Sequence, residues 1–410
     1  MSGDQGPGVR PRDIRLLRWL TCLMFLMFAM TTDAVGMIIP RIIETFGLSM
    51  AKASAFHYAT MAGVGLAGVG LGFLADRLGR APAIVLGLAI FALASFLIAT
   101  ARSFELLLVL LFASGAAIAV FKTGAMALIG DLSRSTREHT AAMNAVEGFF
   151  AVGAILGPLI VGGLLSVGAP WQGLYVIAGL LCAGLIVLAL LARFPKPAGA
   201  QREPVSLADV LIVARDAHAL TFGLAMMLYV GVETAVYVWL PTLLTGEVET
   251  RGRVAAYALS IFFALRAVGR FVGAWLLERM DWTWVLAISA LAVLACFCGA
   301  LIGGVATAAV LLPLSGLFMS VIYPTLNSKA ISGFPKARHG AAAGLFLFLT
   351  CVSAVASPLA MGALGDAFGG PRPGFMLAAA LAALLAAMTV GNLILDPSRA
   401  LLARRDAADY

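Results

Sequence analysis

The stretch GFLADRLGRAP, residues 72–82, places an aspartate and two arginines in a short loop between two long apolar segments. The segment before it reads AFHYATMAGVGLAGVGL, and the segment after it reads AIVLGLAIFALASFLIA. Apolar segments of about 20 residues are long enough to cross a bilayer as helices, whereas charged side chains are costly inside one. The stretch therefore predicts a tight charged turn that joins two membrane spans.

Composition places the whole chain in a membrane. Hydrophobic residues fill 61% of its 410 positions and charged residues 12%, whereas soluble domains carry about 25% charged residues. The formal charge of +7 therefore indicates basic loops that fix orientation rather than a nucleic-acid partner. The five cysteines lie in apolar stretches without the spacing of a metal site, so we predict no metal and no cofactor.

Twelve segments are apolar and long enough to span, and they lack the alternation of a transmembrane β-barrel. We therefore predict an all-α integral membrane protein. The expected spans are residues 16–40, 54–74, 82–101, 104–130, 141–166, 172–193, 217–241, 253–277, 283–302, 305–332, 340–366 and 373–394.

Basic residues predict the orientation. An even number of spans leaves both termini on one side, where we count 19 of the 28 Lys and Arg residues, with six on the other side and three within spans. Because cytoplasmic loops carry the excess of basic residues, we expect both termini in the cytoplasm and a multi-pass protein of the plasma (cell inner) membrane.

The polar segment FPKPAGAQREPVSLADVLIVARD divides the chain into two sets of six spans. We predict an N-terminal six-helix bundle over 1–193, a cytoplasmic linker over 194–216, and a C-terminal six-helix bundle with a short cytoplasmic tail over 217–410. The end of the linker carries apolar residues on one helical face, so we expect a short helix on the membrane surface there.

The two halves repeat each other at a spacing of 200 residues. Asp33 corresponds to Glu233, and Pro158 in GPLIVGG corresponds to Pro358 in SPLAMGA. Two parallel six-helix repeats, with a site between them near the midplane, are a common transporter architecture. The repeat therefore predicts two pseudo-symmetric bundles and a transport function.

The charged loop resembles the signature loop of the major facilitator superfamily through Gly72, Leu74, Asp76, Arg77, Gly79 and Arg80. The stretches LYVGVETAVYVWLP (228–241) and FMSVIYPTLNS (318–328) are similar to the fucose–proton symporter branch, whose members carry sugars and related solutes. The resemblance covers essentially the whole chain. It implies the major facilitator fold, alternating access, and a proton site at the aspartate of the first helix, here Asp33.

In such a fold the charged loop acts as a cytoplasmic gate. Asp76 is expected to face the positive N-terminal end of the eleventh helix, while Arg77 and Arg80 bind carboxylates or lipid phosphates. The alternative is that the arginines are orientation signals only. A weaker copy of the motif lies in the other half. The expected gate residues are Gly72, Asp76, Arg77, Gly79, Arg80, Arg270, Glu278 and Arg279.

Ionisable residues within spans are costly and usually functional. We identify Asp33, Lys122, Glu147, Glu233, Arg266 and Arg270. At about 1.5 Å per residue, Lys122 and Glu147 lie at similar depths in an antiparallel hairpin. We expect them to pair, either as a structural salt bridge or on the cavity wall.

Glu233 is expected to pair with Arg266. We expect no basic residue at the depth of Asp33, and a carboxylate in a low-dielectric cavity can bind and release a proton near neutral pH. We therefore predict proton coupling at Asp33, Glu233 and Glu147. The alternative for Asp33 is a capping or hydrogen-bonded carboxylate without a coupling role.

A hydroxylated solute can be recognised by aromatic stacking and hydrogen bonds. The predicted substrate-binding residues are Lys122, Tyr229, Arg266, Tyr323 and Asn327. We expect Trp239 near the outer edge of its span, where tryptophan belts occur, and His57 at the surface.

Two departures from the sugar-symporter branch affect the substrate prediction. Lys122 stands where that branch has a glutamate in the fourth helix, which favours an anionic solute such as a sugar acid. GAILGPLIVGG in the fifth span resembles the antiporter signature, but has three residues rather than two between the proline and the glycine pair. This stretch fits either efflux or close helix packing.

We therefore predict a proton-coupled symporter of a small polar organic solute, with a sugar or sugar acid favoured. The alternative is a proton-coupled antiporter that exports amphipathic drugs. A membrane enzyme or receptor is disfavoured because HExxH, GxSxG and nucleotide-binding motifs are missing from the sequence. Expected partners are the solute, protons and membrane lipid, and the protein is expected to work as a monomer.

Overall fold

The computed structural model describes residues 10–71, 78–133, 136–195, 207–245, 253–335, 338–395 and 397. Every regular element in this part of the chain is a helix. Contacts divide the described residues into two units, the first made of residues 10–34 and 59–195, and the second of residues 35–58 and 207–395.

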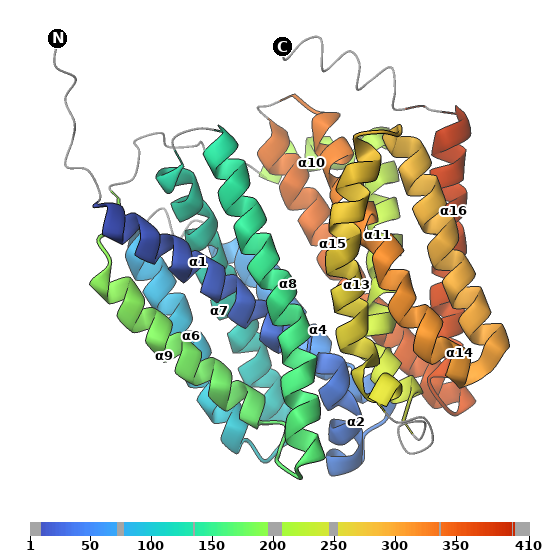
Figure 1. Cartoon of the computed structure of the whole chain (residues 1–410), viewed down its shortest axis with the longest axis horizontal. Coiled ribbons are helices and arrows are strands. Elements are labelled where there is room, and N and C mark those ends of the chain that lie inside the picture. The colour runs from blue at the N-terminus through green and yellow to red at the C-terminus, as the bar shows by residue number, and fades with distance from the viewer. Residues whose placement is uncertain are drawn as a thin grey trace. The chain divides into compact units, whose positions relative to one another are not determined.

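The first unit is a helical bundle built from apolar runs. Its helices are α1 (Pro11–Thr32), most of α4 (Ala55–Leu71), α6 (Arg80–Thr100), α7 (Phe104–Leu132), α8 (Thr136–Ser166) and α9 (Gly173–Leu191). In this unit α1 packs against α8 and α9, and α6 packs against α7 and α9 (Figure 1). Polar caps mark helix starts, as where the Ser103 hydroxyl accepts a hydrogen bond from the Leu106 amide at the start of α7.

The second unit contains the later helices and one early segment. Its helices are α2 (Val35–Phe46), α3 (Met50–Ala53), α10 (Leu207–Ala214), α11 (Ala217–Leu243), α13 (Arg253–Leu277), α14 (Trp282–Ser332), α15 (His339–Phe368) and α16 (Arg372–Leu395). Helix α11 contacts α14, α15 and α16 (Figure 1). It is the central helix of this unit, and nearly all its residues between Phe222 and Leu240 are buried.

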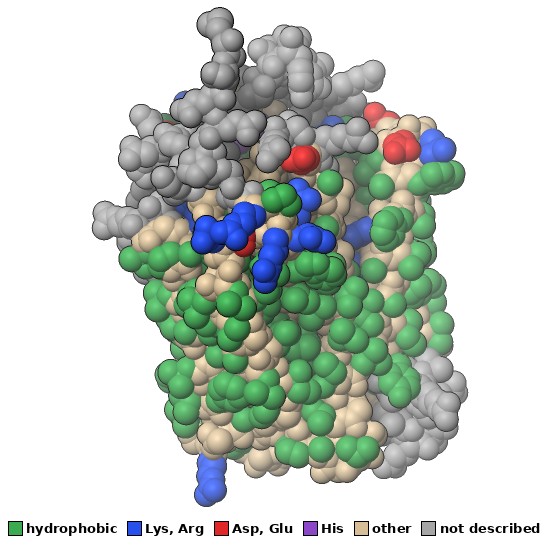
Figure 2. All heavy atoms as spheres, turned by 60° about the vertical axis from the view of Figure 1, so that its left-hand side comes forward, with side chains coloured by type: hydrophobic (Ala, Val, Ile, Leu, Met, Phe, Trp, Pro, Cys, Tyr) green, Lys and Arg blue, Asp and Glu red, His purple; other side chains and the backbone are tan. Residues whose placement is uncertain are grey.

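The chain is a multi-pass membrane protein. Ten stretches of the described residues are helical, long and apolar enough to span a bilayer. Two of the expected spans, 283–302 and 305–332, are merged in α14, and α4 is only 17 residues long in its described part. On the face shown in Figure 2, hydrophobic side chains cover the middle, and Lys and Arg side chains gather toward one edge. These observations agree with the twelve predicted helices.

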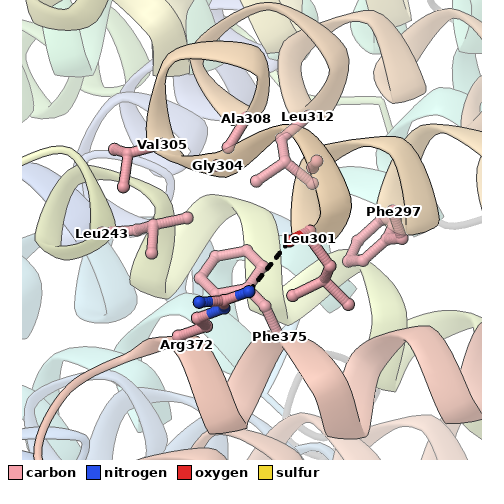
Figure 3. Close-up of a pocket in the computed structure, with 10 residues that line it drawn as sticks. Leu243, Phe297, Leu301, Gly304, Val305, Ala308, Leu312, Arg372 and Phe375 are labelled. Carbon is pink, nitrogen blue, oxygen red and sulfur yellow. Dashed lines mark hydrogen bonds between the residues drawn. The ribbon is translucent and has the colours of Figure 1, made fainter.

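Helix α14 turns back on itself at Gly304. This residue has a φ of 76° and a ψ of −172°, a conformation open to glycine but strained for other residues. Next to the turn, Arg372 donates a hydrogen bond of 3.1 Å to the carbonyl of Leu301, beside a small apolar cavity of about 60 Å³ (Figure 3). The guanidinium thus joins the start of α16 to the last turn of α14 before Gly304.

The first span is broken at Asp33. Helix α1 ends at Thr32, Asp33 is its C-cap, and α2 begins at Val35. Discontinuous membrane helices expose backbone groups and mark binding sites in many transporters. The break also lies at the boundary between the two units, because residues 35–58 cluster with the second one.

Close backbone contacts hold the early segment in the second unit. A side chain at Gly36 would overlap the carbonyl oxygen of Tyr237. The carboxylate of Asp366 on α15 accepts hydrogen bonds from the amides of Met50 and Ala51, at 2.6 and 2.9 Å. These amides lie at the start of α3 and have no intrahelical partner. The predicted bundle boundaries at 193 and 217 stay a prediction.

A helix is present at the end of the linker, as expected. Helix α10 packs against α15 and α11, with Val213 buried and Leu211 and Ile212 exposed. The rest of the linker, from residue 196 to residue 206, lies outside the described residues.

The 200-residue repeat is visible in helix packing. In the first unit, side chains at Gly153 and Gly157 of α8 would overlap the carbonyls of Leu26 and Met30 on α1. The corresponding residues of α15 are Ser353 and Ser357. Ser353 donates a 2.6 Å hydrogen bond to the carbonyl of Met227 on α11. The pairs α1–α8 and α11–α15 therefore make corresponding contacts with different chemistry.

Candidate functional site

A buried polar cluster lies halfway along α11 in the second unit. Glu233 is 8% exposed, and its Oε1 atom accepts a hydrogen bond of 3.1 Å from the Tyr229 hydroxyl, one helical turn earlier. The same oxygen lies 2.6 Å from Nη2 of Arg266 on α13. The expected ion pair between Glu233 and Arg266 is therefore present, and Tyr229 joins it.

Aromatic side chains extend this cluster to α14. The rings of Tyr229 and Tyr323 have centroids 5.9 Å apart and planes at 34°. Asn327 lies one turn after Tyr323 and is half-buried, so the amide and the ring lie on one face of α14. Arg270 is half-buried one turn after Arg266 on α13. The predicted substrate residues of the second unit thus lie on three helices, α11, α13 and α14, that pack against one another.

The chemistry of this cluster suits a neutral hydroxylated group. A buried carboxylate and guanidinium cancel each other's charge, and charge-assisted hydrogen bonds are stronger than neutral ones. Tyrosine rings offer apolar faces with a polar tip. The Glu233–Arg266 pair has no net charge, so solute hydroxyls can replace its hydrogen bonds without adding a charge to this low-dielectric region.

Lys122 is a basic residue in the interior of a span of the first unit. It stands on α7, and its Nζ atom lies 5.8 Å from the ring centroid of Phe25 and 5.2 Å from that of Phe28. Both rings belong to α1, and the Phe28 ring also packs edge-on against Phe150 of α8. The ammonium is thus placed against aromatic faces, which attract cations.

Glu147 lies on α8 and is half-buried. Its pairing with Lys122 stays a prediction. The sequence did not predict the aromatic surroundings of Lys122, because Phe25 and Phe28 lie three spans earlier along the chain. Their spacing of three residues is the signal that places both rings on one face of a helix.

Asp33 lies at the break between α1 and α2 and is half-buried. Its backbone amide closes the last turn of α1 on the carbonyl of Ala29. Thr31 and Thr32 just before it donate side-chain hydrogen bonds to the carbonyl of Phe28, at 2.9 and 3.1 Å. The carboxylate therefore sits where a membrane helix ends, not within a continuous one.

The charged loop is described only in part. Gly72, Asp76 and Arg77 lie outside the described residues. Gly79 precedes α6 with a φ of 92°, a conformation that favours glycine. Arg80 follows it, and its Nε atom donates a 3.0 Å hydrogen bond to Oδ2 of Asp131 at the end of α7.

The Arg80–Asp131 contact gives the arginine the carboxylate partner that was expected for it. Both side chains are largely buried, at 16% and 12% exposure. Asp131 itself was missed by the sequence analysis. The signal for it was an acid at the inner end of the fourth span, on the same side as the loop.

Glu278 and Arg279, the weaker copy of Asp76 and Arg77 in the other half, are exposed. Glu278 and Arg279 lie 3.7 Å apart, with side chains 76% and 53% exposed. Arg279 lies over the ring of Trp275 at 4.4 Å and donates a hydrogen bond to its carbonyl. The gate role of both loops stays a prediction.

Two sequence-based placements are wrong. His57, expected at the surface, is 1% exposed, because its Nε2 atom lies 3.2 Å from the Tyr237 hydroxyl and its ring packs edge-on against that tyrosine. Trp239, expected at the membrane interface, is 1% exposed, because α11 is enclosed by its neighbouring helices. Both errors arise from helix packing that one span cannot reveal.

Comparison with known proteins gives a family match. The model of the Major Facilitator Superfamily matches residues 21–358. The L-fucose-proton symporter of Escherichia coli strain K12 is 26% identical over 392 residues, covering 85% of this chain and 87% of that protein. The multidrug resistance protein MdtL of Shewanella oneidensis is 30% identical over 178 residues, 43% of this chain and 44% of that protein.

Solved structures share the fold. The nucleoside transporter NupG gives a TM-score of 0.75 at 16% identity, covering 92% of this chain and 98% of that one. The fucose transporter FucP in its outward conformation gives a TM-score of 0.64 at 23% identity, covering 92% and 99% of the two chains. At these identities the likeness concerns the fold alone.

Proposed function

The chain belongs to the major facilitator superfamily, whose members are transporters rather than enzymes, and from this premise we propose that it carries a sugar or a sugar acid across the membrane together with protons. Alternating access, in which the solute site opens to one side at a time, is the proposed mechanism. The plasma membrane, with both termini in the cytoplasm, is the proposed location, and a monomer the proposed functional unit.

The observation that carries the proposal is the Tyr229–Glu233–Arg266 cluster with the Tyr323 ring beside it. Ligand sites in carriers combine apolar or aromatic walls with a few placed polar groups. A sugar presents hydroxyls on a ring with apolar faces, which matches a carboxylate, a guanidinium and two tyrosines. The likeness to the L-fucose-proton symporter over 85% of this chain supports the same class of solute.

We assign the coupled proton to Asp33, with Glu233 and Glu147 as further carboxylates in the pathway. Asp33 lies at a helix break within the first long span, and ionisable groups at this depth mark proton relays. Protonation would remove a charge from the break and lower the cost of moving it through an apolar surrounding.

Lys122 is proposed to favour an acidic solute. A lysine ammonium over aromatic rings offers a positive end to a carboxylate, while the paired Glu233 and Arg266 offer a neutral surface to hydroxyls. A sugar acid has both kinds of group. The gate function of Arg80 and its neighbours, which hold the cytoplasmic side closed, completes the proposed cycle.

The test is proton flux in proteoliposomes. The purified protein is reconstituted with a pH dye inside, and sugars, sugar acids, amino acids and cationic drugs are added outside one at a time. We expect internal acidification with sugars or sugar acids in the wild type and its loss in Asp33→Asn. Glu105→Gln, which removes an exposed acid at the start of α7, is the control and should keep the flux.

Export of amphipathic drugs by proton antiport is the second candidate. The similarity to the multidrug resistance protein over 43% of this chain favours it. Alkalinisation of acid-loaded vesicles on addition of a lipophilic cation, with no response to sugars, would establish this alternative. Solute flux without proton movement in either protein would reject the coupling role of Asp33.

A further inference from the structure

A groove of about 480 Å³ lies between the end of α13, the start of α14 and the last turns of α14. This volume falls in the range of small-molecule sites, about 300–1,000 Å³. Its walls combine apolar and polar side chains, among them Leu277, Met280, Trp282, Thr325, Ser328 and Lys329. All of them belong to the second unit.

The groove is separate from the Tyr229–Glu233–Arg266 cluster. An α-helix advances by about 100° per residue, so Tyr323 and Asn327 share one face of α14. Thr325 and Lys329 share the opposite face. The Tyr323 ring packs against Tyr229 of α11, whereas Thr325 and Lys329 line the groove. A ligand in the groove therefore occupies a second site.

The polar groups of the groove suit an anion. The ammonium of Lys329 lies 5.7 Å from the ring centroid of Trp282, so a cation is held at an aromatic wall. Thr325 is 7% exposed, and its Oγ1 atom makes no hydrogen bond within the described part of the chain. A buried hydroxyl without a partner is unfavourable, and rotation of the Thr325 side chain toward the groove would let a ligand oxygen satisfy it. Ser328 adds an exposed hydroxyl.

The acid in the wall is already engaged. Asp281 caps the start of α14 and accepts hydrogen bonds from the amide and hydroxyl of Thr283, at 2.9 and 2.6 Å. Its charge lies at the positive end of a helix, where it is stabilised. Lys329 thus remains the charged donor that the groove offers to a ligand.

Neighbouring side chains fix the walls in place. The ring of Phe222 lies 6.3 Å from that of Trp282, and a ring nitrogen of His218 lies 3.3 Å from the carbonyl of Lys329. Both residues belong to α11. Preorganised walls lower the entropy lost when a ligand binds.

We propose that this groove binds an organic anion, a phosphate or carboxylate attached to an apolar ring or chain. The anionic group contacts Lys329 and the hydroxyls of Ser328 and Thr325, and the apolar part packs against Trp282, Leu277 and Met280. The anion comes either from a soluble metabolite or from a lipid headgroup. A bound anion joins the ends of α13 and α14, two helices that also carry Arg266 and Tyr323, and so regulates the helices of the proposed substrate site.

The experiment measures binding of phenyl phosphate to the full-length protein in neutral detergent by calorimetry, with phenol as the uncharged comparison. We expect saturable binding of phenyl phosphate and at least tenfold weaker binding in Lys329→Gln. Thr325→Val, which keeps the shape but removes the hydroxyl, should weaken it severalfold. Arg279→Gln is the matched control, because it removes one positive charge near the end of α13 but outside the groove.

A second arm tests the lipid source. The protein is placed in nanodiscs with and without phosphatidylglycerol, and phenyl phosphate binding is measured in each. Weaker phenyl phosphate binding in nanodiscs with phosphatidylglycerol, for the wild type and Arg279→Gln alike, assigns the groove to a lipid headgroup. Undiminished binding assigns it to a soluble anion. Equal losses in Lys329→Gln and Arg279→Gln, with both variants keeping the wild-type melting temperature, would overturn the proposal. A lack of saturable phenyl phosphate binding by the wild-type protein would also overturn it. The assay needs no transport, so its outcome is independent of the proposed substrate.

Discussion

The helix pairs α1–α8 and α11–α15 occupy corresponding places in the repeat but are joined differently. In the first pair, Gly153 and Gly157 let the backbone of α8 approach the carbonyls of α1. In the second, the hydroxyl of Ser353 donates a hydrogen bond to a carbonyl of α11. Small residues let membrane helices pack closely, and serine adds a hydrogen bond to that packing. The comparison shows that a duplicated contact keeps its position while its chemistry changes.

The acids of the repeat differ in the same way. Asp33 lies where α1 ends, and the chain continues as α2. Glu233 lies within an unbroken α11, with Arg266 and Tyr229 as partners. The Glu233 contacts join α11 to α13, whereas protonation of Asp33 would remove a charge from the break between α1 and α2. We therefore expect Glu233 to stabilise the second unit and Asp33 to respond to protons.

The largest expected effect follows from Glu233→Gln. The substitution leaves the guanidinium of Arg266 in a largely buried place without its acid, and breaking one partner of a buried pair costs about 3–5 kcal/mol. We expect a clear fall in melting temperature and loss of transport, measured by thermal unfolding and proteoliposome flux. The double variant Glu233→Gln with Arg266→Met should recover part of the stability. Unchanged stability in Glu233→Gln would contradict the structural role of the pair.

A smaller effect is expected from Gly153→Ala. The added methyl group would overlap the Leu26 carbonyl, so α1 and α8 must separate, at a cost of about 1–3 kcal/mol. Gly163→Ala on the same helix is the control, because a side chain there would meet no atom within 4 Å. Thermal unfolding should show a loss for the first variant and none for the second, and equal behaviour would argue against close backbone packing.

Ser353→Ala should cost less than Gly153→Ala. It removes one hydrogen bond to the Met227 carbonyl, worth about 1 kcal/mol, but creates no steric overlap. The expected result is a small fall in melting temperature with normal helix content. Ser166→Ala, at an exposed serine of α8, should leave the melting temperature unchanged. A loss as large as that of Gly153→Ala would show that the hydroxyl, not close approach, dominates in both halves.

The smallest effect is expected at the exposed loop pair. Glu278 and Arg279 are largely in solvent, and such pairs contribute about 0–1 kcal/mol. Glu278→Gln should therefore leave the melting temperature nearly unchanged, whereas Asp131→Asn, which breaks the buried contact with Arg80, should lower it. Reversal of this order would place the stronger structural contact in the second half.

The fold class and most membrane spans could be predicted from the sequence alone. Helices α13 and α16 begin and end within two residues of the expected spans 253–277 and 373–394, because long apolar runs bounded by polar residues leave few alternatives. The merger of two spans in α14 was not predicted. The two spans are joined at Gly304 alone. A turn of one residue has no polar segment that would mark it in the sequence.

Side-chain contacts were predicted less well. The pairing of Glu233 with Arg266 could be predicted because a buried charge without a partner is costly. The burial of His57 did not, because it depends on Tyr237, 180 residues later in the chain. Depth along a span can be estimated from residue number, but the direction a side chain faces depends on helix rotation, which the nearly uniform apolar pattern of these helices does not specify.

The turn at Gly304 also constrains biogenesis. A single glycine separates the two membrane-spanning parts of α14. No hydrophilic loop between them can stay in solution while the second part is synthesised. The two halves of this helix must therefore enter the bilayer together as one hairpin. An epitope tag or a protease site inserted at this turn would keep the halves apart, so such insertions should reduce the yield of membrane-integrated protein more than they reduce the activity of the molecules that do integrate.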